Sequence, residues 1–188
     1  MSEEHHADYS SFSSSSSKED AYETLILSAK ALFVENDVPL PAISNLSNAA
    51  SLLWHLFQQI TPSVNWSGFY LRDPTLKESE VENQQLILGP FQGKVACQLI
   101  KFGRGVCGAA AATAKTQLVP NVHEFPGHIA CDGDTNSEIV VPIVATNGKV
   151  IGVIDIDSTE LNSFDEIDKK YLEELASILV ELTNWKNY

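Results

Sequence analysis

The sequence predicts an α+β domain in which helices cover a central antiparallel sheet. Two segments with apolar residues at helical spacing come first, short β-branched and aromatic runs separated by turn residues follow, and one long amphipathic segment closes the chain. Strands grouped between helices, without regular strand–helix alternation, are typical of an α+β layered domain. A length of 188 residues is enough for one domain with a sizeable core.

The composition excludes several classes of protein. The chain has 25 acidic and 12 basic residues and a net charge of −13, so it lacks the basic surface that nucleic-acid binding requires. No apolar stretch is long enough to cross a membrane, and the acidic start of the chain does not resemble a secretory signal. We therefore expect a cytoplasmic protein with no nucleic-acid or membrane partner, small enough to diffuse into the nucleus. In a reducing compartment its three cysteines are expected to be reactive, ligating or inert rather than structural bridges.

An arm and two helices are expected in the N-terminal part. Residues 1–17 are poor in apolar side chains and end in serines, which predicts a mobile arm ahead of one domain at 18–188. Ser17 is expected to cap a first helix that is stopped by Pro39 and the proline two residues later. A second amphipathic helix is expected over residues 45–60.

The middle of the chain predicts several strands and one short helix. Alternation along the first strand, residues 64–71, places Trp66 and Tyr70 on the face opposite Phe69. The glycine-rich run 103–108 predicts a tight turn that opens a short helix. The remaining expected elements are strands at 86–91, 95–102 and 118–119, a long loop at 120–136, and a closing helix over 164–185 capped by Ser163 or Asn162.

Residues 137–157 predict a β-hairpin. Two apolar, β-branched runs flank Asn147-Gly148, which is the strongest short-range signal for a two-residue hairpin turn. A two-residue loop fixes the register of both strands. The expected pairs, from the turn outward, include Thr146 with Lys149, Val140 with Asp155, and Glu138 with Asp157.

Three carboxylates gather at the open end of this hairpin. Because side chains two apart share a face, Glu138, Asp155 and Asp157 are expected to point the same way. Like charges directly opposite each other destabilise a sheet, so a bound cation, a ligand ammonium group or a shared proton should offset the repulsion. The alternative is that these residues mark a solvated strand end, where carboxylates are usually exposed.

The cysteine spacing matches neither a common zinc site nor a thioredoxin-like motif. Cys97, taken alone, is expected to be a buried, inert thiol on a strand. Cys107 is expected near a helix N-terminus, where partial positive charge and Arg104 would stabilise a thiolate. Cys131 lies in a polar loop, and for it and Cys107 both a reactive and an inert interpretation stay open. A zinc site that combines His123, His128, Cys131 and another cysteine is a further alternative.

Five segments carry a family resemblance. They are residues 65–70 (Asn-Trp-Ser-Gly-Phe-Tyr), 103–108 (Gly-Arg-Gly-Val-Cys-Gly), 128–132 (His-Ile-Ala-Cys-Asp), 137–142 (Ser-Glu-Ile-Val-Val-Pro) and 152–158 (Gly-Val-Ile-Asp-Ile-Asp-Ser). Together, and in this order, they resemble the free methionine-(R)-sulfoxide reductases, which are single GAF-domain enzymes. The likeness spans about residues 21–185 and looks like that of a fungal member. It implies a GAF fold, with a central antiparallel sheet of about six strands flanked by helices, and a homodimer.

The resemblance also implies the activity and the site. The expected reaction is thiol-dependent reduction of free L-methionine (R)-S-oxide to L-methionine, with no bound cofactor or metal and with electrons from thioredoxin, which thioredoxin reductase and NADPH keep reduced. The implied substrate-binding residues are Trp66, Tyr70, Glu138, Asp155 and Asp157. The implied catalytic residues are Cys97, Cys107, Cys131, Glu138 and Asp157.

The residues supply the parts that this chemistry needs. A thiolate attacks the sulfoxide sulfur, while a carboxyl that its neighbours keep protonated gives a proton to the oxygen. The resulting sulfenic acid condenses with a second thiol to a disulfide. Cys131 is favoured as the nucleophile because it leads into the acidic hairpin, Cys107 is the alternative, and Cys97 is expected to be a resolving thiol. The competing interpretation is a non-catalytic GAF domain that senses small molecules, which would need no cysteine.

Overall fold

A six-stranded antiparallel sheet forms the centre of the protein, as predicted. The computed structural model describes residues 12, 17–76, 83–127 and 133–186. The strand order is β5-β4-β3-β8-β7-β6. The strands are β3 (Val64–Arg72), β4 (Gln85–Gly93), β5 (Leu99–Lys101), β6 (Gln117–Val119), β7 (Ser137–Val144) and β8 (Val150–Ser158). The fold is thus α+β, with the nine-residue strands β3 and β8 side by side in the middle.

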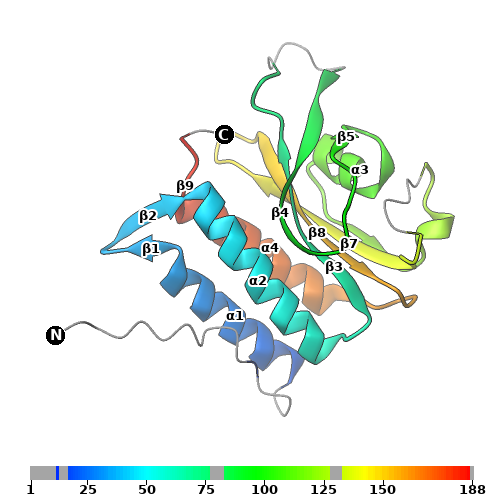
Figure 1. Cartoon of the computed structure of the whole chain (residues 1–188), viewed down its shortest axis with the longest axis horizontal. Helices are drawn as coiled ribbons and strands as arrows, with labels where there is room; N and C mark the ends of the chain where they lie inside the picture. The colour runs from blue at the N-terminus through cyan, green and yellow to red at the C-terminus, as the bar shows by residue number, and fades with distance from the viewer. Residues whose placement is uncertain (1–11, 13–16, 77–82, 128–132, 187–188) are drawn as a thin grey trace.

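Helices cover both faces of the sheet, but unequally. Three long helices lie on one face and one short helix lies on the other (Figure 1). The three are α1 (Lys18–Leu32), α2 (Ala42–Ile60) and α4 (Glu166–Glu181), and the short one is α3 (Gly105–Thr113). The main core is packed between the three helices and the sheet, whereas a smaller cluster lies under α3. The alternation predicted along β3 is confirmed, since Phe69 belongs to the main core and Trp66 and Tyr70 belong to the cluster under α3.

The predicted caps are right for the first helix and wrong for the last. Ser17 caps α1 in a reciprocal capping box, as expected. Helix α4 begins after Asp165 rather than after Ser163 or Asn162, because the Asp165 carboxylate accepts hydrogen bonds from two backbone N–H groups of the first turn.

A small second sheet was not predicted. It joins β1 (Val34–Glu35), β2 (Val38–Pro41) and β9 (Thr183–Asn184). Helix α1 therefore ends before the prolines that were expected to stop it, α2 begins three residues earlier than residue 45, and the closing helix ends at residue 181. Asn45 ties these segments together, because its buried side-chain amide donates to the Phe33 and Leu182 carbonyls at 3.1 and 3.0 Å.

The hairpin register agrees with the prediction, although the predicted turn is wrong. Glu138 pairs with Asp157 and Val140 with Asp155. The loop, however, has three residues rather than two, since Ala145 N–H donates to the Lys149 carbonyl and Gly148 (φ 81°) takes the left-handed position. A bulge before Val144 then adds one residue to β8 and restores the register further out.

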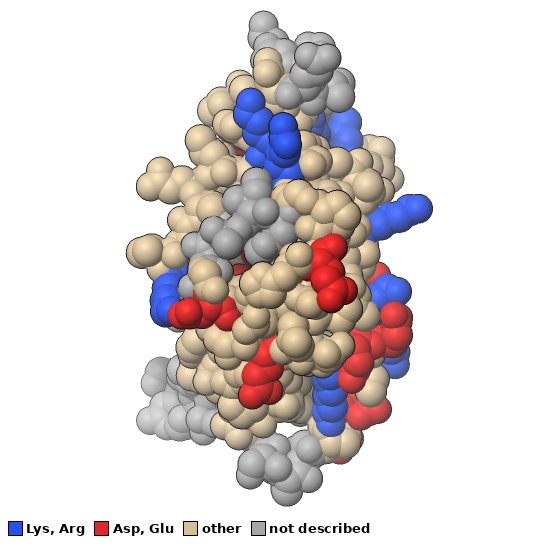
Figure 2. Space-filling model, turned by 90° about the vertical axis from the view of Figure 1, so that its right-hand side faces the viewer, with Lys and Arg blue, Asp and Glu red and all other residues tan. Residues whose placement is uncertain are grey.

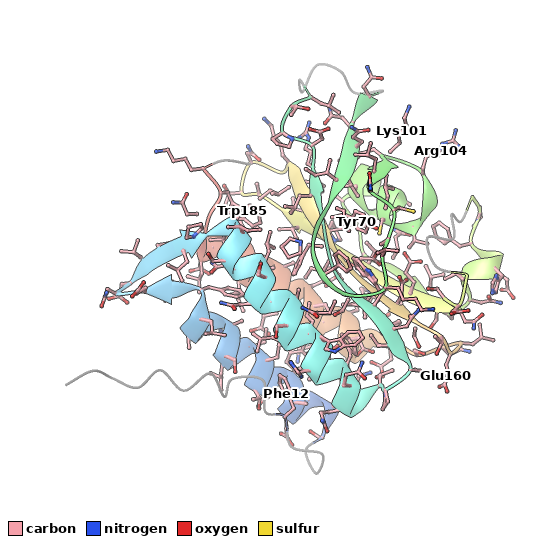
Figure 3. The ribbon with its side chains drawn as sticks, viewed as in Figure 1. Phe12, Tyr70, Lys101, Arg104, Glu160 and Trp185 are labelled. Carbon is pink, nitrogen blue, oxygen red and sulfur yellow. The ribbon has the colours of Figure 1, made fainter. Side chains whose placement is uncertain are left out.

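The strand predicted over residues 95–102 is wrong in its first half. Strand β4 continues to Gly93, which pairs with Trp66, and β5 begins only at Leu99. Residues 95–97 therefore have no regular secondary structure. Most of the predicted serine-rich arm and residues 128–132 of the predicted long loop lie outside the described residues. Phe12 of that arm is described, and it is buried against the main core (Figure 3). No described helix is long and apolar enough to cross a membrane.

Candidate active site

A cavity of about 360 Å³ lies beneath α3, β5 and the segment between β4 and β5. Its lining includes all the predicted site residues that the structure describes: Trp66, Tyr70, Cys97, Cys107, Glu138, Asp155 and Asp157. They come from five different parts of the chain, so the sheet and α3 together assemble the site. Cys131 lies outside the described residues, and the roles of all these residues stay predictions.

The register of three neighbouring strands brings the carboxylates together. Glu138 on β7 pairs directly with Asp157 on β8, and Asp155 on β8 pairs with Gly68 on β3. Glu138 and Asp155 are 6% and 5% exposed, and Asp157 is half-buried. The interpretation of these residues as a solvated strand end is therefore wrong for the two buried carboxylates.

Burial decides the protonation of these carboxyl groups. Burial, followed by the charges of Asp157 and Asp155, raises the pKa of Glu138 well above its usual value, which favours the protonated form of this group. Burial raises the pKa of Asp155 to about 7, although a hydrogen bond with the Cys107 thiol acts in the opposite direction. The site thus pairs Glu138, whose raised pKa favours its protonated form, with Asp155, whose pKa lies near neutrality.

Cys107 lies in the first turn of α3, as predicted, but the expected thiolate stabilisation is wrong. Burial, and then the charges of Asp155 and Glu138, raise the pKa of the Cys107 thiol well above its usual value. The thiol faces carboxylates, whereas Arg104 is solvent-exposed at the N-cap of the helix. The favourable helix terminus is outweighed because a buried thiolate beside two acids is costly.

Cys107, Glu138 and Asp155 offer three ligand atoms that lie within 4.8 Å of one another. In the described part of the chain, this is the group that could hold a metal ion. His123 is not part of it, since its Nε2 lies 3.0 Å from Asn136 Oδ1 in a hydrogen bond. The zinc alternative also needs His128 and Cys131, which lie outside the described residues.

Cys97 is neither inert nor on a strand, so that expectation is wrong. It is half-buried on the irregular segment between β4 and β5, and it is disulfide-bonded. Cys107 is a free thiol. Two apolar side chains close to Cys97 in the sequence are strongly exposed at the cavity, Val95 at 89% and Leu99 at 57%.

Aromatic side chains form another wall of the cavity. Trp66 stacks on Tyr70, with ring centroids 5.7 Å apart, and on Phe91 at 5.3 Å. The Trp66 indole N–H donates to the Lys94 carbonyl at 3.1 Å, which fixes the ring and the start of the 94–98 segment. Burial, followed by the charges of Asp155 and Cys107, raises the pKa of Tyr70 well above 10, so its hydroxyl stays protonated.

Several lining residues were missed from the sequence. Thr135 is 4% exposed, and its hydroxyl has no hydrogen-bond partner among the residues that the structure describes. The same is true of one carboxylate oxygen of Asp155, Oδ1. Two unpaired, buried polar atoms in one cavity indicate a polar ligand, because such atoms are normally satisfied. Lys101 and Arg104 also line the cavity. The positions of Thr135 before β7 and of Lys101 and Arg104 around a glycine turn match no sequence pattern that would mark them as site residues.

The comparisons with known proteins agree with this geometry. The GAF domain family model matches residues 47–181. The chain is 51% identical over 175 residues to a curated protein named free methionine-R-sulfoxide reductase from Saccharomyces cerevisiae, a match that covers 93% of this chain and 92% of the relative. The chain belongs to the free methionine-R-sulfoxide reductases. It is therefore a GAF-domain enzyme, as the resemblance implied, and the yeast relative is consistent with the likeness to a fungal member.

Similar solved structures give the same picture. One described as the structure of the GAF domain has a TM-score of 0.87 and 48% identity, covering 98% of this chain and 99% of that one. The reductase from Neisseria meningitidis, solved in complex with its substrate, has a TM-score of 0.76 and 40% identity. That match covers 91% of this chain and 92% of the Neisseria chain.

Proposed function

We propose that this reductase converts free L-methionine (R)-S-oxide to L-methionine by thiol chemistry in the cavity under α3. The observation that carries the proposal is the meeting of the Cys107 thiol with two buried carboxyl groups, Glu138 and Asp155, within 4.8 Å. The relatives named for this activity support the choice of substrate. The aromatic wall formed by Trp66 and Tyr70 is suited to the methyl group of the substrate.

The protonation states supply the proton transfers that the first step needs. Cys107 gives its proton to Asp155, whose pKa of about 7 leaves a carboxylate available at neutral pH. The thiolate attacks the sulfoxide sulfur, and Glu138, whose raised pKa favours the protonated form, gives a proton to the sulfoxide oxygen. The oxygen ends on the cysteine as a sulfenic acid and methionine leaves, so one thiol and one sulfoxide become one sulfenic acid and one thioether.

A second thiol completes the oxidative half of the cycle. It condenses with the sulfenic acid to form a disulfide and one water molecule. A dithiol reductant then exchanges with this disulfide and restores both thiols. Cys97 forms a disulfide in the structure while Cys107 is a free thiol, so the bond at Cys97 does not involve Cys107.

We propose thioredoxin as this reductant. Val95 and Leu99 lie two residues to either side of Cys97 and are 89% and 57% exposed. Apolar side chains exposed beside a disulfide are a suitable contact surface for a protein that must bring its own thiol to that bond. The electrons would come from NADPH through thioredoxin reductase. We also propose the homodimer that the resemblance implied, which light scattering of the purified protein would test.

The test is reduction of racemic free methionine sulfoxide with thioredoxin, thioredoxin reductase and NADPH, followed by chiral analysis of the remaining sulfoxide. We expect loss of the R-epimer alone and no activity on a peptide-bound sulfoxide. Persistence of the R-epimer with every dithiol reductant would contradict the proposal and would favour a GAF domain that only binds small molecules.

Single-turnover experiments on reduced protein would identify the nucleophile. The geometry supports Cys107, and the sequence order alone favoured Cys131. If Cys107 attacks, the Cys107→Ser variant releases no methionine in the first turnover, while Cys131→Ser releases one equivalent. The opposite result would assign the attack to Cys131. Cys97→Ser should complete the first turnover in either case and fail to recycle.

A further inference from the structure

The cavity is lined by charged residues of both signs, and the proposed reaction uses only the acidic ones. Glu138, Asp155 and Asp157 form its acidic part. Lys101, the last residue of β5, and Arg104, the N-cap of α3, line the same cavity and are exposed. In Figure 3 both labelled cations lie at the β5 and α3 end of the molecule, together with Tyr70. Figure 2 shows the right-hand side of the molecule as it is oriented in Figure 1. On this face, a group of Lys and Arg side chains lies in the upper part, above most of the Asp and Glu side chains.

Neither cation has a partner among the described residues. No hydrogen bond or ion pair involves the side chain of Lys101 or Arg104, although the chain has about twice as many acids as bases. Other lysines of this protein do pair, for example Lys94 with Asp134 at 2.7 Å. Two unpaired cations at one cavity are therefore available to an anionic group of a ligand.

A free amino acid carries such a group. Its ammonium group is attracted by the acidic part of the cavity, and its sulfoxide must reach a cysteine. The carboxylates repel its α-carboxylate, and Lys101 and Arg104 are the lining residues that can attract it. Arginine presents a planar pair of donors that matches a carboxylate, whereas lysine adds a point charge.

We infer that Arg104, assisted by Lys101, forms a subsite for the α-carboxylate of the substrate and makes the enzyme selective for free amino acids. This inference rests on the proposed function. The first turn of α3 adds partial positive charge, since Arg104 makes no side-chain capping bond there. With the sulfoxide beside Cys107, the carboxylate then lies toward the exposed cations. A methionine sulfoxide inside a peptide has an uncharged amide at this position and gains nothing from them.

The experiment compares two substrates in a set of variants. The substrates are methionine (R)-S-oxide and its α-amide, which differ only in the negative charge. Both are assayed at about pH 6.5, where their α-amino groups are protonated. The variants are Arg104→Gln, Arg104→Lys and Lys101→Met. Lys115→Met, at an exposed position outside this cavity, is a matched control for the loss of one positive charge.

In the wild type we expect kcat/KM for the free acid to exceed that for the amide by about 10- to 100-fold, as one charge-assisted contact provides. Arg104→Gln should lower kcat/KM for the free acid at least tenfold, mainly through KM, and leave the amide value unchanged. Arg104→Lys should recover part of the loss, Lys101→Met should show a smaller effect of the same kind, and Lys115→Met should behave as wild type.

Two outcomes would overturn the inference. One is an equal loss on both substrates in Arg104→Gln, since that would reflect damage to α3 rather than loss of a carboxylate contact. The other is an unchanged preference for the free acid in the Arg104 and Lys101 variants. A wild type that reduces neither substrate would instead contradict the proposed function itself, so the two failures are distinguishable.

Discussion

Replacing Asp155 with asparagine should make the protein more stable at alkaline pH while it abolishes turnover. The pKa of Asp155 rises from 3.8 to about 7 on folding because the carboxyl is buried. The folded protein therefore binds more protons than the unfolded chain between these values, and the free energy of unfolding falls as the pH rises through this window. A pKa shift of about three units corresponds to about 4 kcal/mol in the free energy of unfolding. The wild type has lost all of this stability above about pH 8.

Asparagine carries no charge at any pH, whereas Asp155 of the wild type becomes charged as the pH rises. The stability that Asp155→Asn gains over wild type should therefore increase with pH. We expect Asp155→Asn to be about 2–4 kcal/mol more stable than wild type at about pH 8.5, and nearly equal to it near pH 4. Urea unfolding of both proteins in the same redox state, over a pH series, measures this difference. A gain that does not change with pH, or a loss at alkaline pH, would refute the reasoning.

Asp165→Asn is a control with the opposite sign. Burial acts to raise the pKa of Asp165, but hydrogen bonds from Lys18 and from the capped backbone N–H groups lower it overall. The charge of Asp165 therefore stabilises the fold above its unfolded pKa, and this stability is lost as the pH falls. Asp165→Asn should thus be less stable than wild type at neutral pH and converge with it in acid.

Three further variants probe the cavity and the sheet. Thr135→Val should lower kcat/KM about tenfold and leave stability unchanged or about 1 kcal/mol higher, because the hydroxyl is buried without a partner; denaturation together with turnover measures both. A double change of Val95 and Leu99 to serine should raise KM for thioredoxin about five- to tenfold and should affect turnover driven by a small dithiol less, although both residues also line the cavity; parallel assays with the two reductants would show the difference. Gly152→Ala should cost about 3 kcal/mol in urea unfolding, since the new Cβ would lie 2.4 Å from the Tyr70 carbonyl oxygen; an unchanged midpoint would be inconsistent with the packing of β3 on β8.

The periodicity of the sequence was sufficient to predict the sheet and its acidic site. The pairing of Glu138 with Asp157 follows from any hairpin that closes at Asn147 and keeps its apolar face inward. The turn itself was wrong, because a three-residue loop followed by a bulge gives the same outer register as a two-residue loop. Two local errors compensated each other, so the register alone did not reveal the loop type.

Local pattern failed where tertiary contacts decide the conformation. Residues 95–97 read as a strand, but β3 binds β4 as far as Gly93, and the Lys94 carbonyl accepts the Trp66 indole N–H. The chain is thereby held over the cavity and exposes Val95. The contact of Cys107 with Asp155 joins α3 to β8, and the resulting pKa of the thiol opposes what its place on the helix predicts.

Several features that cost stability meet in this cavity. Two acidic residues, Glu138 and Asp157, are paired across β7 and β8, the pKa of Asp155 is raised to about 7, and two buried polar atoms, Asp155 Oδ1 and Thr135 Oγ1, lack partners among the described residues. The opposite face of the sheet, packed on α1, α2 and α4, is a continuous apolar core that provides the compensating stability. In the proposed binding mode, the ammonium group of methionine sulfoxide would lie among these carboxylates, and its oxygen atoms would take protons and hydrogen bonds. A ligand with a positive charge and polar oxygens would complement this cavity, which is why stability and turnover should respond in opposite directions when Asp155 or Thr135 is replaced.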